Sequence, residues 1–328
     1  MTIGRFAPSP TGRMHLGNVY AALMSWLAAR SEGGRWILRI EDLDPQRSRM
    51  EYALQMEDDL RWLGLDWDEG GTESIGTCAD GLRRAGKGPH GPYMQSRRHE
   101  HYAEALRRIE AMGLTYPCYC TRADIMATQA PHQSDGRIVY PGTCRPTSMG
   151  GKLTAEDVPN GHRRAPSTRV VVPEREIRFT DAVCGPQRVN LAEECGDFVL
   201  RRSDGAWAYQ LAVVTDDALM GVNQVVRGND LLASAAQQIY LYELLGYEPP
   251  VFAHIPLLVN EAGQRLSKRD ASLSLAVLRE KYSAEELTGR LAAATGLIPE
   301  YAPTRAADLV SGFRLPENPP ATITMVTE

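Results

Sequence analysis

The chain has 328 residues, and its 41 acidic against 36 basic side chains leave a formal net charge of -5. This length is enough for one large α/β domain with an insertion or for two ordinary domains, so stability needs no disulfide scaffold. The negative charge excludes a protein that coats nucleic acid indiscriminately, because phosphate binding needs dense lysine and arginine. The sequence shows no leader-like start and no apolar run of the roughly 18 residues that a membrane span requires, so we expect a cytoplasmic protein without a membrane partner.

The N-terminal part of the chain alternates between strand and helix patterns. A short strand is predicted over residues 3–7, followed by a Pro/Gly loop and a helix with apolar residues at helical spacing, which Gly33 and Gly34 end. A second strand over 36–40 precedes a second amphipathic helix that ends at Gly64. Strand, helix, strand and helix in this order predict a parallel sheet.

The pattern then becomes irregular before it resumes. A Gly-rich stretch over 69–92 predicts a mobile surface loop, and residues 118–173, rich in Pro, Gly and Arg, predict an inserted subdomain without a large core. The α/β alternation is expected to resume with strands over 198–201, 222–226 and 255–259 and with helices from 208 and over 231–245. One or two short helices follow, and the Pro-rich tail from Pro316 is expected to fray.

The first candidate site lies where the first strand ends. Residues 5–12 read Arg-Phe-Ala-Pro-Ser-Pro-Thr-Gly, and residues 15–18 read His-Leu-Gly-Asn at the entry to the first helix. A Gly-containing turn before a helix N-terminus exposes backbone N–H groups and the positive end of the helix dipole, which stabilise a triphosphate. His15 would then donate to phosphate, whereas a His-x-Gly taken alone is more often an ordinary loop.

The second candidate site follows the last apolar strand. Residues 263–269 read Gly-Gln-Arg-Leu-Ser-Lys-Arg, and Lys268 can neutralise phosphate charge as pyrophosphate leaves. A Ser-Lys pair in a basic loop means little alone. The joint occurrence is more informative, because one signal opens the predicted sheet and the other follows its end in the same chain.

Acidic residues end the second predicted strand, in Glu41, Asp42 and Asp44. Ligands of open α/β sheets bind at such strand ends, where a carboxylate can hold the ammonium group of an amino acid. Helix N-capping is the alternative reading for Asp42 and Asp44. Glu41 is therefore the candidate ammonium ligand.

Three of the six cysteines gather in the predicted insertion, as Cys118, Cys120 and Cys144. Three thiolates with a fourth ligand can hold zinc tetrahedrally and so fold a short segment that lacks its own core. From spacing alone, a chance grouping of reduced thiols stays open, and His132 competes with Tyr140 as the fourth ligand. The remaining cysteines have no ligand-like spacing; they are Cys78, Cys184 and Cys195.

Taken together, these motifs resemble the class I glutamyl-tRNA synthetases. Residues 5–12 and 15–18 are similar to the segment around their HIGH motif, and residues 265–269 are similar to KMSKS. Asn18 stands for the final His, and Arg265 and Leu266 stand for the Lys and Met. Because asparagine still donates a hydrogen bond and leucine conserves the volume of methionine, we expect activity to survive.

The resemblance implies an α/β fold: a Rossmann-type, doubly wound parallel-sheet catalytic domain with an inserted zinc-binding subdomain and a short helical C-terminal part. The implied divisions are 1–117 and 174–270 for the two halves of the catalytic domain, 118–173 for the insertion and 271–328 for the extension. No anticodon-binding domain has room in that extension.

The resemblance also implies the roles of individual residues. Arg5 would face the side-chain carboxylate of glutamate, and Tyr209, otherwise read as a core helix residue, would join Arg227 in the same site. The implied glutamate-binding set is Arg5, Ala7, Ser9, Glu41, Tyr209 and Arg227. The implied ATP-binding set, with Mg²⁺ on the nucleotide, is His15, Gly17, Asn18, Ser267 and Lys268, of which His15 and Lys268 are catalytic. The implied ligands of one structural zinc ion are Cys118, Cys120, Tyr140 and Cys144.

The short C-terminal part indicates one branch of the family. A glutamyl-tRNA synthetase carries further helical domains that read the anticodon of tRNA(Glu), whereas only residues 270–328 follow the second motif here. The chain therefore resembles the truncated branch, which activates L-glutamate with ATP without tRNA and joins it to queuosine, the modified wobble base of tRNA(Asp). We expect a monomer.

Three alternatives remain to be weighed. A nucleotidyltransferase for another small acid would lack the arginine, glutamate and tyrosine set, and a non-catalytic RNA-binding paralogue would have lost His15 or Lys268; all of these residues are present. The third alternative is a catalytic fragment of an ordinary glutamyl-tRNA synthetase that charges the tRNA 3′ end. It is excluded only if the natural chain stops after Glu328.

Overall fold

The structure is a computed structural model that describes residues 1–72, 88–127, 139–146, 165–266 and 274–325. Its centre is a five-stranded sheet in the order β10, β9, β1, β2 and β3, in which each neighbouring pair runs parallel. The strands are β1 (Ile3–Phe6), β2 (Arg35–Leu38), β3 (Glu69–Gly70), β9 (Gln224–Gly228) and β10 (Val251–Ile255). The predicted parallel α/β sheet is confirmed.

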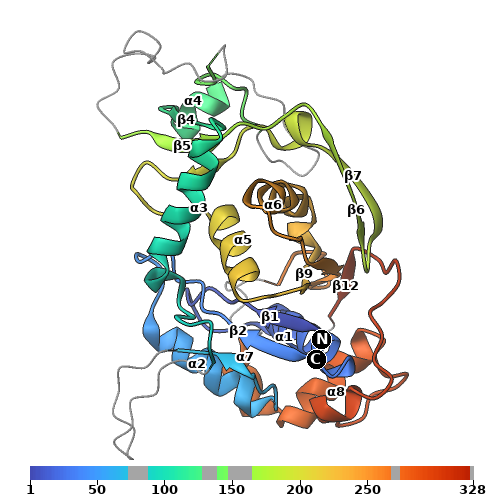
Figure 1. Cartoon of the computed structure of the whole chain (residues 1–328). Coiled ribbons are helices and arrows are strands. Elements are labelled where there is room, and N and C mark those ends of the chain that lie inside the picture. The colour runs from blue at the N-terminus through green and yellow to red at the C-terminus, as the bar shows by residue number, and fades with distance from the viewer. Residues whose placement is uncertain (73–87, 128–138, 147–164, 267–273, 326–328) are drawn as a thin grey trace, which may run out of the picture.

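Helices cover both faces of this sheet (Figure 1). On one face lie α1 (Leu16–Ser31) and α2 (Met50–Trp62), and on the other lie α5 (Tyr209–Leu219) and α6 (Leu232–Leu245). Side chains alternate across the pleat accordingly. Trp36 and Leu38 belong to the core beside α1, whereas Ile37 between them belongs to the core beside α5 and α6. The sheet is therefore buried on both faces, as in a doubly wound fold.

The strand expected over 198–201 exists, but it does not continue the parallel sheet. It forms β8 (Val199–Arg201), which pairs antiparallel with β5 (Ser167–Val170), and β5 pairs antiparallel with β4 (Thr115–Cys118). A short apolar run fits either sheet, and long-range pairing decides between them. The helices α3 (His99–Ala111) and α4 (Arg122–Ala127) precede and follow β4. The division of the chain into domains stays a prediction.

An antiparallel hairpin, β6 (Glu176–Asp181) with β7 (Gly185–Asn190), was not predicted. Along β6, Ile177 and Asp181 are buried, whereas Arg178 between them is exposed on the opposite face. The hairpin lies against the β10 edge of the main sheet, where the backbone N–H of Ala182 donates to the carbonyl of Phe252 at 2.8 Å. This contact brings Asp181 close to residues of β10.

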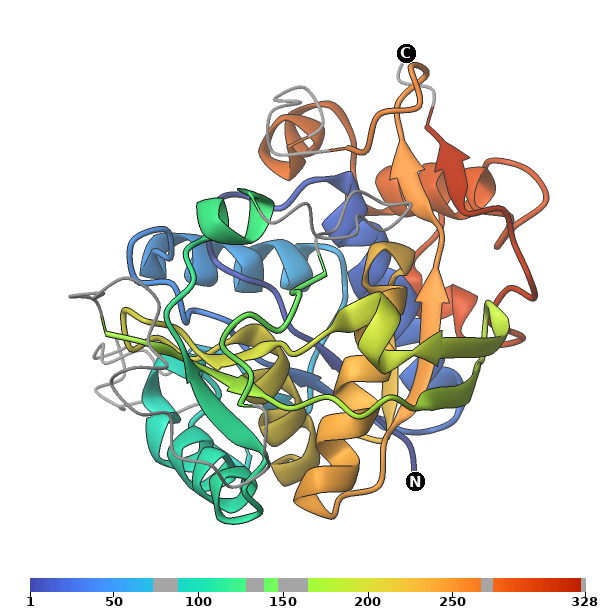
Figure 2. The same cartoon turned by 90° about the horizontal axis from the view of Figure 1, so that it is seen from above.

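The strand expected over 255–259 is two strands. β10 ends at Ile255, and β11 (Leu257–Val259) leaves the main sheet, because Pro256 has no N–H for the ladder. β11 pairs in parallel with β12 (Thr322–Thr324), as the orange and dark red arrows near the C-terminus show (Figure 2). The expectation that the tail frays from Pro316 is therefore wrong, since long-range pairing with β11 orders residues 322–324.

The remaining elements are short. The helices expected after the second motif are α7 (Leu275–Lys281) and α8 (Ala284–Ala294). Single turns are η1 (Gln95–Arg97), η3 (Leu191–Cys195), η4 (Asn229–Leu231) and η6 (Ala306–Leu309). The loop predicted to be mobile lies outside the described residues over 73–87. Among the described helices, none combines the length and apolar character needed to cross a membrane.

Candidate active site and thiol cluster

A cavity of about 500 Å³ opens at the carboxyl ends of β1, β9 and β10 and at the N-terminus of α1. From the adjacent strands β1 and β9 the chain continues in opposite directions along the sheet, to β2 on one side and to β10 on the other. Open α/β sheets bind ligands at this kind of topological switch point. The predicted residues that line the cavity are Arg5, Ala7, Ser9, His15, Gly17, Asn18, Glu41, Tyr209 and Arg227.

Two buried arginines on adjacent strands line this cavity together with Glu41, beside the ion pair of Arg265 with Asp230. Arg5 on β1 and Arg227 on β9 are only 4% and 5% exposed. Glu41 follows β2, and Tyr209 is the first residue of α5. Guanidinium groups match carboxylates, and a carboxylate matches an ammonium group. The arrangement therefore suits a ligand that carries two carboxylates and one amine.

Glu41 lies in competing electrostatic surroundings. Burial raises the pKa of its carboxyl, while the nearby guanidinium groups of Arg39 and Arg5 oppose that rise. Arg39 Nη2 donates to Glu41 Oε1 at 3.3 Å. A bound ammonium group would bring a positive charge close to the buried carboxylate and so lower its pKa. The ionised carboxylate and a cationic ligand therefore stabilise each other.

A buried ion-pair network beneath the cavity was missed by the sequence analysis. Arg39 Nη1 donates to Asp217 Oδ1 at 2.6 Å, and Arg5 Nε lies 3.5 Å from the same oxygen. The neighbouring Asp216 accepts from Arg98 Nε at 2.5 Å and from Tyr102 Oη at 2.8 Å. Burial works against the charge of Arg39, but Asp217, Asp216 and Glu41 outweigh it and raise its pKa. The network thereby holds the guanidinium of Arg5 in place, and it also holds Arg39, which donates to Glu41.

A signal for this network was present in the sequence. Arg39 interrupts an apolar strand, and Asp216 and Asp217 interrupt an apolar helix. Charged residues are rarely buried unless they are paired, so these interruptions call for partners. Sequence separation hid which residues pair, because Arg39 and Asp217 are 178 positions apart.

His15 caps α1 and lines the cavity. Its Nδ1 accepts the backbone N–H of Gly17 at 3.1 Å, and Asn18 Oδ1 accepts the backbone N–H of His15 at 3.1 Å. Because Nδ1 accepts, the proton of the neutral ring lies on Nε2, which remains a donor. A Cβ on Gly17 would come 3.0 Å from the His15 ring, so glycine permits this close packing. The helix N-terminus and the ring donor together suit an anion.

The two aspartates after Glu41 do not cap a helix. The N-cap residue of α2 is Arg49, without a side-chain cap, so the alternative reading is wrong. Asp42 instead accepts the backbone N–H and the hydroxyl of Ser96, at 2.8 and 2.5 Å. Asp44 accepts from Arg47 Nε at 2.8 Å within its own loop.

The second motif is described only at its beginning. Arg265 lines the cavity and donates to Asp230 Oδ2 at 2.6 Å, and Leu266 is buried beside it. Ser267 and Lys268 lie outside the described residues. The motif therefore reaches the cavity mouth from β11, on the side opposite to β2.

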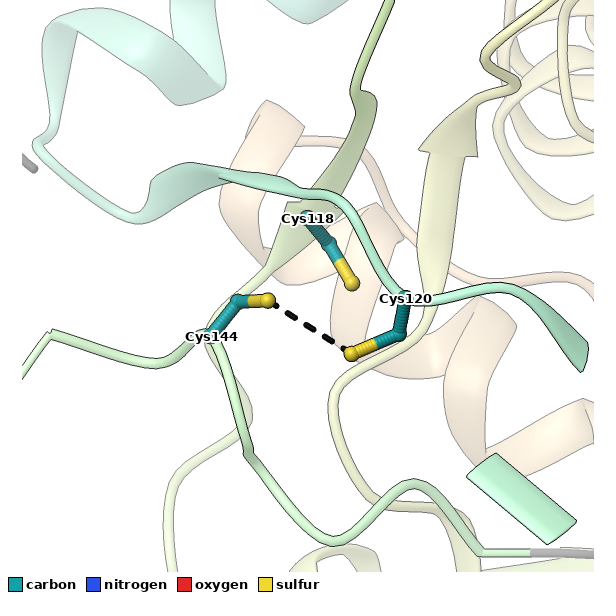
Figure 3. Close-up of side chains that lie close together, drawn as sticks. All are labelled: Cys118, Cys120 and Cys144. Carbon is teal, nitrogen blue, oxygen red and sulfur yellow. Dashed lines mark hydrogen bonds between the residues drawn. The ribbon is translucent and has the colours of Figure 1, made fainter. Parts of the chain in front are cut away.

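The predicted thiol cluster forms away from this cavity, between β4 and the segment 139–146. The sulfur atoms of Cys118, Cys120 and Cys144 all lie within 4.8 Å of one another (Figure 3). Tyr140 Oη lies 3.4 Å from Cys118 Sγ and 3.8 Å from Cys120 Sγ. The four donors that the family resemblance implied are therefore together, whereas His132 lies outside the described residues.

Positive charge from Arg169 acts on the same cluster. Its guanidinium lies 3.8 Å from the centre of the Tyr140 ring. Burial opposes ionisation of Cys118, but its hydrogen bond with Tyr140 and the charge of Arg169 outweigh burial and lower the pKa of the thiol. Burial, with the nearby Cys144 thiol, raises the pKa of Cys120 to about 12. Adjacent thiolates repel, so a cation is needed before all of them can ionise together.

Comparisons with known proteins agree with the motifs. The family described as tRNA synthetases class I (E and Q), catalytic domain, matches residues 2–300. The chain is 47% identical over 327 residues to the glutamyl-Q tRNA(Asp) synthetase of Nitratidesulfovibrio vulgaris, covering 97% of this chain and 95% of that protein. It is 48% identical over 328 residues to the glutamyl-Q tRNA(Asp) synthetase of Symbiobacterium thermophilum, with the same 97% and 95% coverage.

Solved structures agree as well. The fold is similar to that of the glutamate tRNA ligase from Elizabethkingia meningosepticum in complex with its amino acid, with a TM-score of 0.77 and 28% identity. This similarity covers 98% of the present chain but only 66% of that chain, so the ligase carries a part that has no counterpart here. The chain belongs to the class I tRNA synthetases of the glutamate and glutamine type and, within them, to the glutamyl-Q tRNA(Asp) synthetases.

Proposed function

We propose that this protein activates L-glutamate with ATP and transfers the glutamyl group to queuosine at the wobble position of tRNA(Asp). The observation that carries the proposal is the cavity in which Arg5, Arg227 and Glu41 converge at the switch point of the sheet. The names of relatives that match nearly the whole chain support the choice of queuosine as acceptor.

Glutamate recognition follows from charge matching. Arg5 and Arg227 would bind the two carboxylates, and Glu41 would bind the ammonium group, with Tyr209 beside them. Ala7 and Ser9, in the loop after β1, would border the same ligand. Glutamine lacks the side-chain charge, so a buried arginine would meet a neutral amide in place of the ligand carboxylate.

The reaction divides into two displacements. A carboxylate oxygen of glutamate attacks the α-phosphorus of ATP, and pyrophosphate leaves. His15 Nε2 and the α1 N-terminus at Gly17 and Asn18 would bind phosphate oxygens, as would Ser267 and Lys268. ATP would enter with Mg²⁺ held by its own phosphates. A hydroxyl of the queuosine cyclopentenediol then attacks the acyl carbon, AMP leaves, and the hydroxyl proton passes to solvent.

We also propose one structural zinc ion held by Cys118, Cys120, Cys144 and Tyr140. Zinc–sulfur bonds of about 2.3 Å in a tetrahedron place two sulfur atoms about 3.8 Å apart. Cys120 Sγ and Cys144 Sγ lie 3.6 Å apart, and this spacing supports the proposal. None of the four lines the cavity, which favours a structural role.

The competing function is that of an ordinary glutamyl-tRNA synthetase, which charges the tRNA 3′ end. The similarity of the fold to a glutamate tRNA ligase favours it, and the glutamyl-Q tRNA(Asp) synthetases that match this chain over 95% of their own length speak against it. The proposed form is a monomer, which light scattering of the purified protein will test.

The experiment that tests the proposal compares two tRNA pools with one enzyme preparation. Pyrophosphate exchange should proceed with glutamate and ATP alone, because the proposed activation step uses only groups of the cavity and of the second motif. Labelled glutamate should then enter tRNA from cells that make queuosine and not tRNA from cells that lack it. Equal labelling of the two pools, or label released with the terminal adenosine after nuclease digestion, would assign the chain to 3′-end charging instead.

A further inference from the structure

Two buried side chains hold Arg227 from behind the cavity. Arg227 Nε donates to His254 Nε2 at 2.9 Å, and His254 Nδ1 lies 2.6 Å from Asp181 Oδ2. His254 is 0% exposed and Asp181 is 1% exposed. Neither residue is among those that line the cavity, so any influence on a ligand must pass through Arg227.

The directions of these hydrogen bonds fix the proton on His254. Arginine nitrogens only donate, so Nε2 must accept and carries no proton. The proton of the neutral ring is then on Nδ1 and is donated to the Asp181 carboxylate. The other oxygen of Asp181 accepts the backbone N–H groups of Val183, Cys184 and His254, at 3.0, 2.8 and 3.1 Å. The carboxylate is therefore held in one orientation by the backbone of two elements.

The rest of Arg227 is fixed just as firmly. Its Nη2 donates to the carbonyl of Leu231 at 3.3 Å, and its guanidinium lies 5.1 Å from the centre of the Phe252 ring. Nη1 is buried and makes no hydrogen bond to any described residue. Nη1 is thus the nitrogen of this guanidinium that is left for a ligand, and an unpaired buried donor is costly unless a ligand uses it.

We propose that Asp181 and His254 are positioning residues for glutamate binding, which orient Arg227 so that its Nη1 donates to a substrate carboxylate. This role rests on the proposed function of the cavity, and it assigns a part in glutamate binding to two residues that do not line the cavity. It also gives the β6–β7 hairpin a purpose, since that hairpin carries Asp181 to the back of β10.

The sharpest test is Asp181→Asn, which conserves shape and reverses one hydrogen bond. The amide oxygen can still accept the backbone N–H groups, but the amide nitrogen now donates to His254 Nδ1. The ring proton must then move to Nε2, where it faces the Nε–H of Arg227 as a second donor. In other enzymes, replacing an aspartate that sets the tautomer of a histidine by asparagine lowers activity strongly.

We expect Asp181→Asn to raise the KM for glutamate in pyrophosphate exchange by roughly 10- to 100-fold, with the KM for ATP nearly unchanged. The matched control is Asp197→Asn, a buried aspartate that accepts from Val172 N and Tyr116 Oη and does not line the cavity. This control should leave the KM for glutamate unchanged. An equal rise in both KM values for Asp181→Asn, or none, would overturn the proposal.

A pair of His254 variants separates the two hydrogen bonds. In His254→Gln the amide oxygen can reach the position of Nε2 and accept from Arg227, whereas in His254→Asn the amide nitrogen replaces Nδ1 and reaches only Asp181. The glutamine variant should keep a KM for glutamate at least about tenfold lower than the asparagine variant. Equal values in two variants of equal thermal stability would show that His254 only fills space. A parent enzyme that does not exchange pyrophosphate with glutamate would instead refute the proposed function.

Discussion

The active-site cavity and the thiol cluster are held in place by different forces. The cavity side chains stand on elements buried in two large cores, and salt bridges such as Arg39 to Asp217 orient them before any ligand arrives. The thiol cluster belongs to a small core of Tyr116, Cys118, Tyr140, Cys144 and Val171. Packing prearranges the first site, whereas in the second the proposed zinc ion would supply most of the order by coordination.

Because buried salt bridges order the cavity, we expect the largest loss of stability when one of their charges is removed. Asp217→Asn leaves Arg39 with a weakened partner inside the protein, and breaking a buried pair costs about 3–5 kcal/mol. Denaturant unfolding should show this loss. The exposed pair of Arg305 with Asp308 provides the control, and Asp308→Asn should leave the midpoint unchanged. A similar loss of stability in both variants would show that the buried pair contributes no more than the exposed one.

Catalysis can be separated from binding within the cavity by a change at Lys268. Its charge is expected to act on phosphate oxygens as pyrophosphate leaves, so Lys268→Ala should slow adenylate formation by about 100- to 1000-fold. Glutamate binding, followed by calorimetry, should change little. Equal losses in rate and binding would place Lys268 at the amino acid instead of at the phosphates.

Selectivity should depend on Arg5. Arg5→Ala should raise the KM for glutamate by roughly 10- to 100-fold, because a charge-assisted hydrogen bond is lost, and should reduce the preference for glutamate over glutamine. Pyrophosphate exchange with each amino acid measures both effects. An unchanged ratio of the two amino acids would show that Arg5 does not contact the side-chain carboxylate.

Metal loss should affect the thiol cluster and spare the cavity. Elemental analysis should find about one zinc per chain in the parent and much less in Cys118→Ser. Cys184→Ser is the control, because Cys184 bonds to the carbonyl of His254 and lies outside the cluster. Glutamate activation should change by less than about threefold in Cys118→Ser, since structural sites do not touch the reacting atoms. Full zinc content in that variant would contradict the ligand assignment.

The smallest expected effect is a pH dependence. Burial raises the pKa of Glu41, so its negative charge is lost at a higher pH than in an exposed glutamate. Affinity for the substrate ammonium should therefore weaken as the pH falls through that raised pKa. The KM for glutamate, measured from about pH 8 to about pH 5, should rise toward acid in the parent and stay flat in Glu41→Gln. Parallel curves would exclude Glu41 as the ammonium ligand.

Part of the parallel sheet was readable from the sequence, because β1 and β2 are each followed by a helix with its own apolar face, whereas β3 (Glu69–Gly70) lies in the stretch that was predicted to be a loop. β1, β2, α1 and α2 lie within two residues of their predicted positions or patterns, and Gly64 follows α2 in the left-handed region. The cavity residues could be named as one set only through the family resemblance, because the local pattern of Tyr209 is that of a core helix residue and the strands lie in the order β10, β9, β1, β2 and β3 rather than in chain order.

What could not be read depends on partners far apart in the sequence. The alternation in β6 is short, and nothing local shows that Asp181 will meet His254 73 positions later. The apolar run at β8 does not indicate whether the strand joins the main parallel sheet or the antiparallel sheet with β5. The split at Pro256 was foreseeable from its missing N–H, but the pairing of β11 with the tail was not.

The pairing of β11 with β12 links the C-terminal segment to the wall of the cavity. Leu257 and Leu258 of β11 border the cavity, and the backbone of Leu257 bonds to Ala321 at 3.0 Å. Met325 N also bonds to the carbonyl of Val259 at 2.8 Å. A C-terminus trimmed back past Thr322, for example to aid crystallisation, would therefore disturb the wall of the cavity.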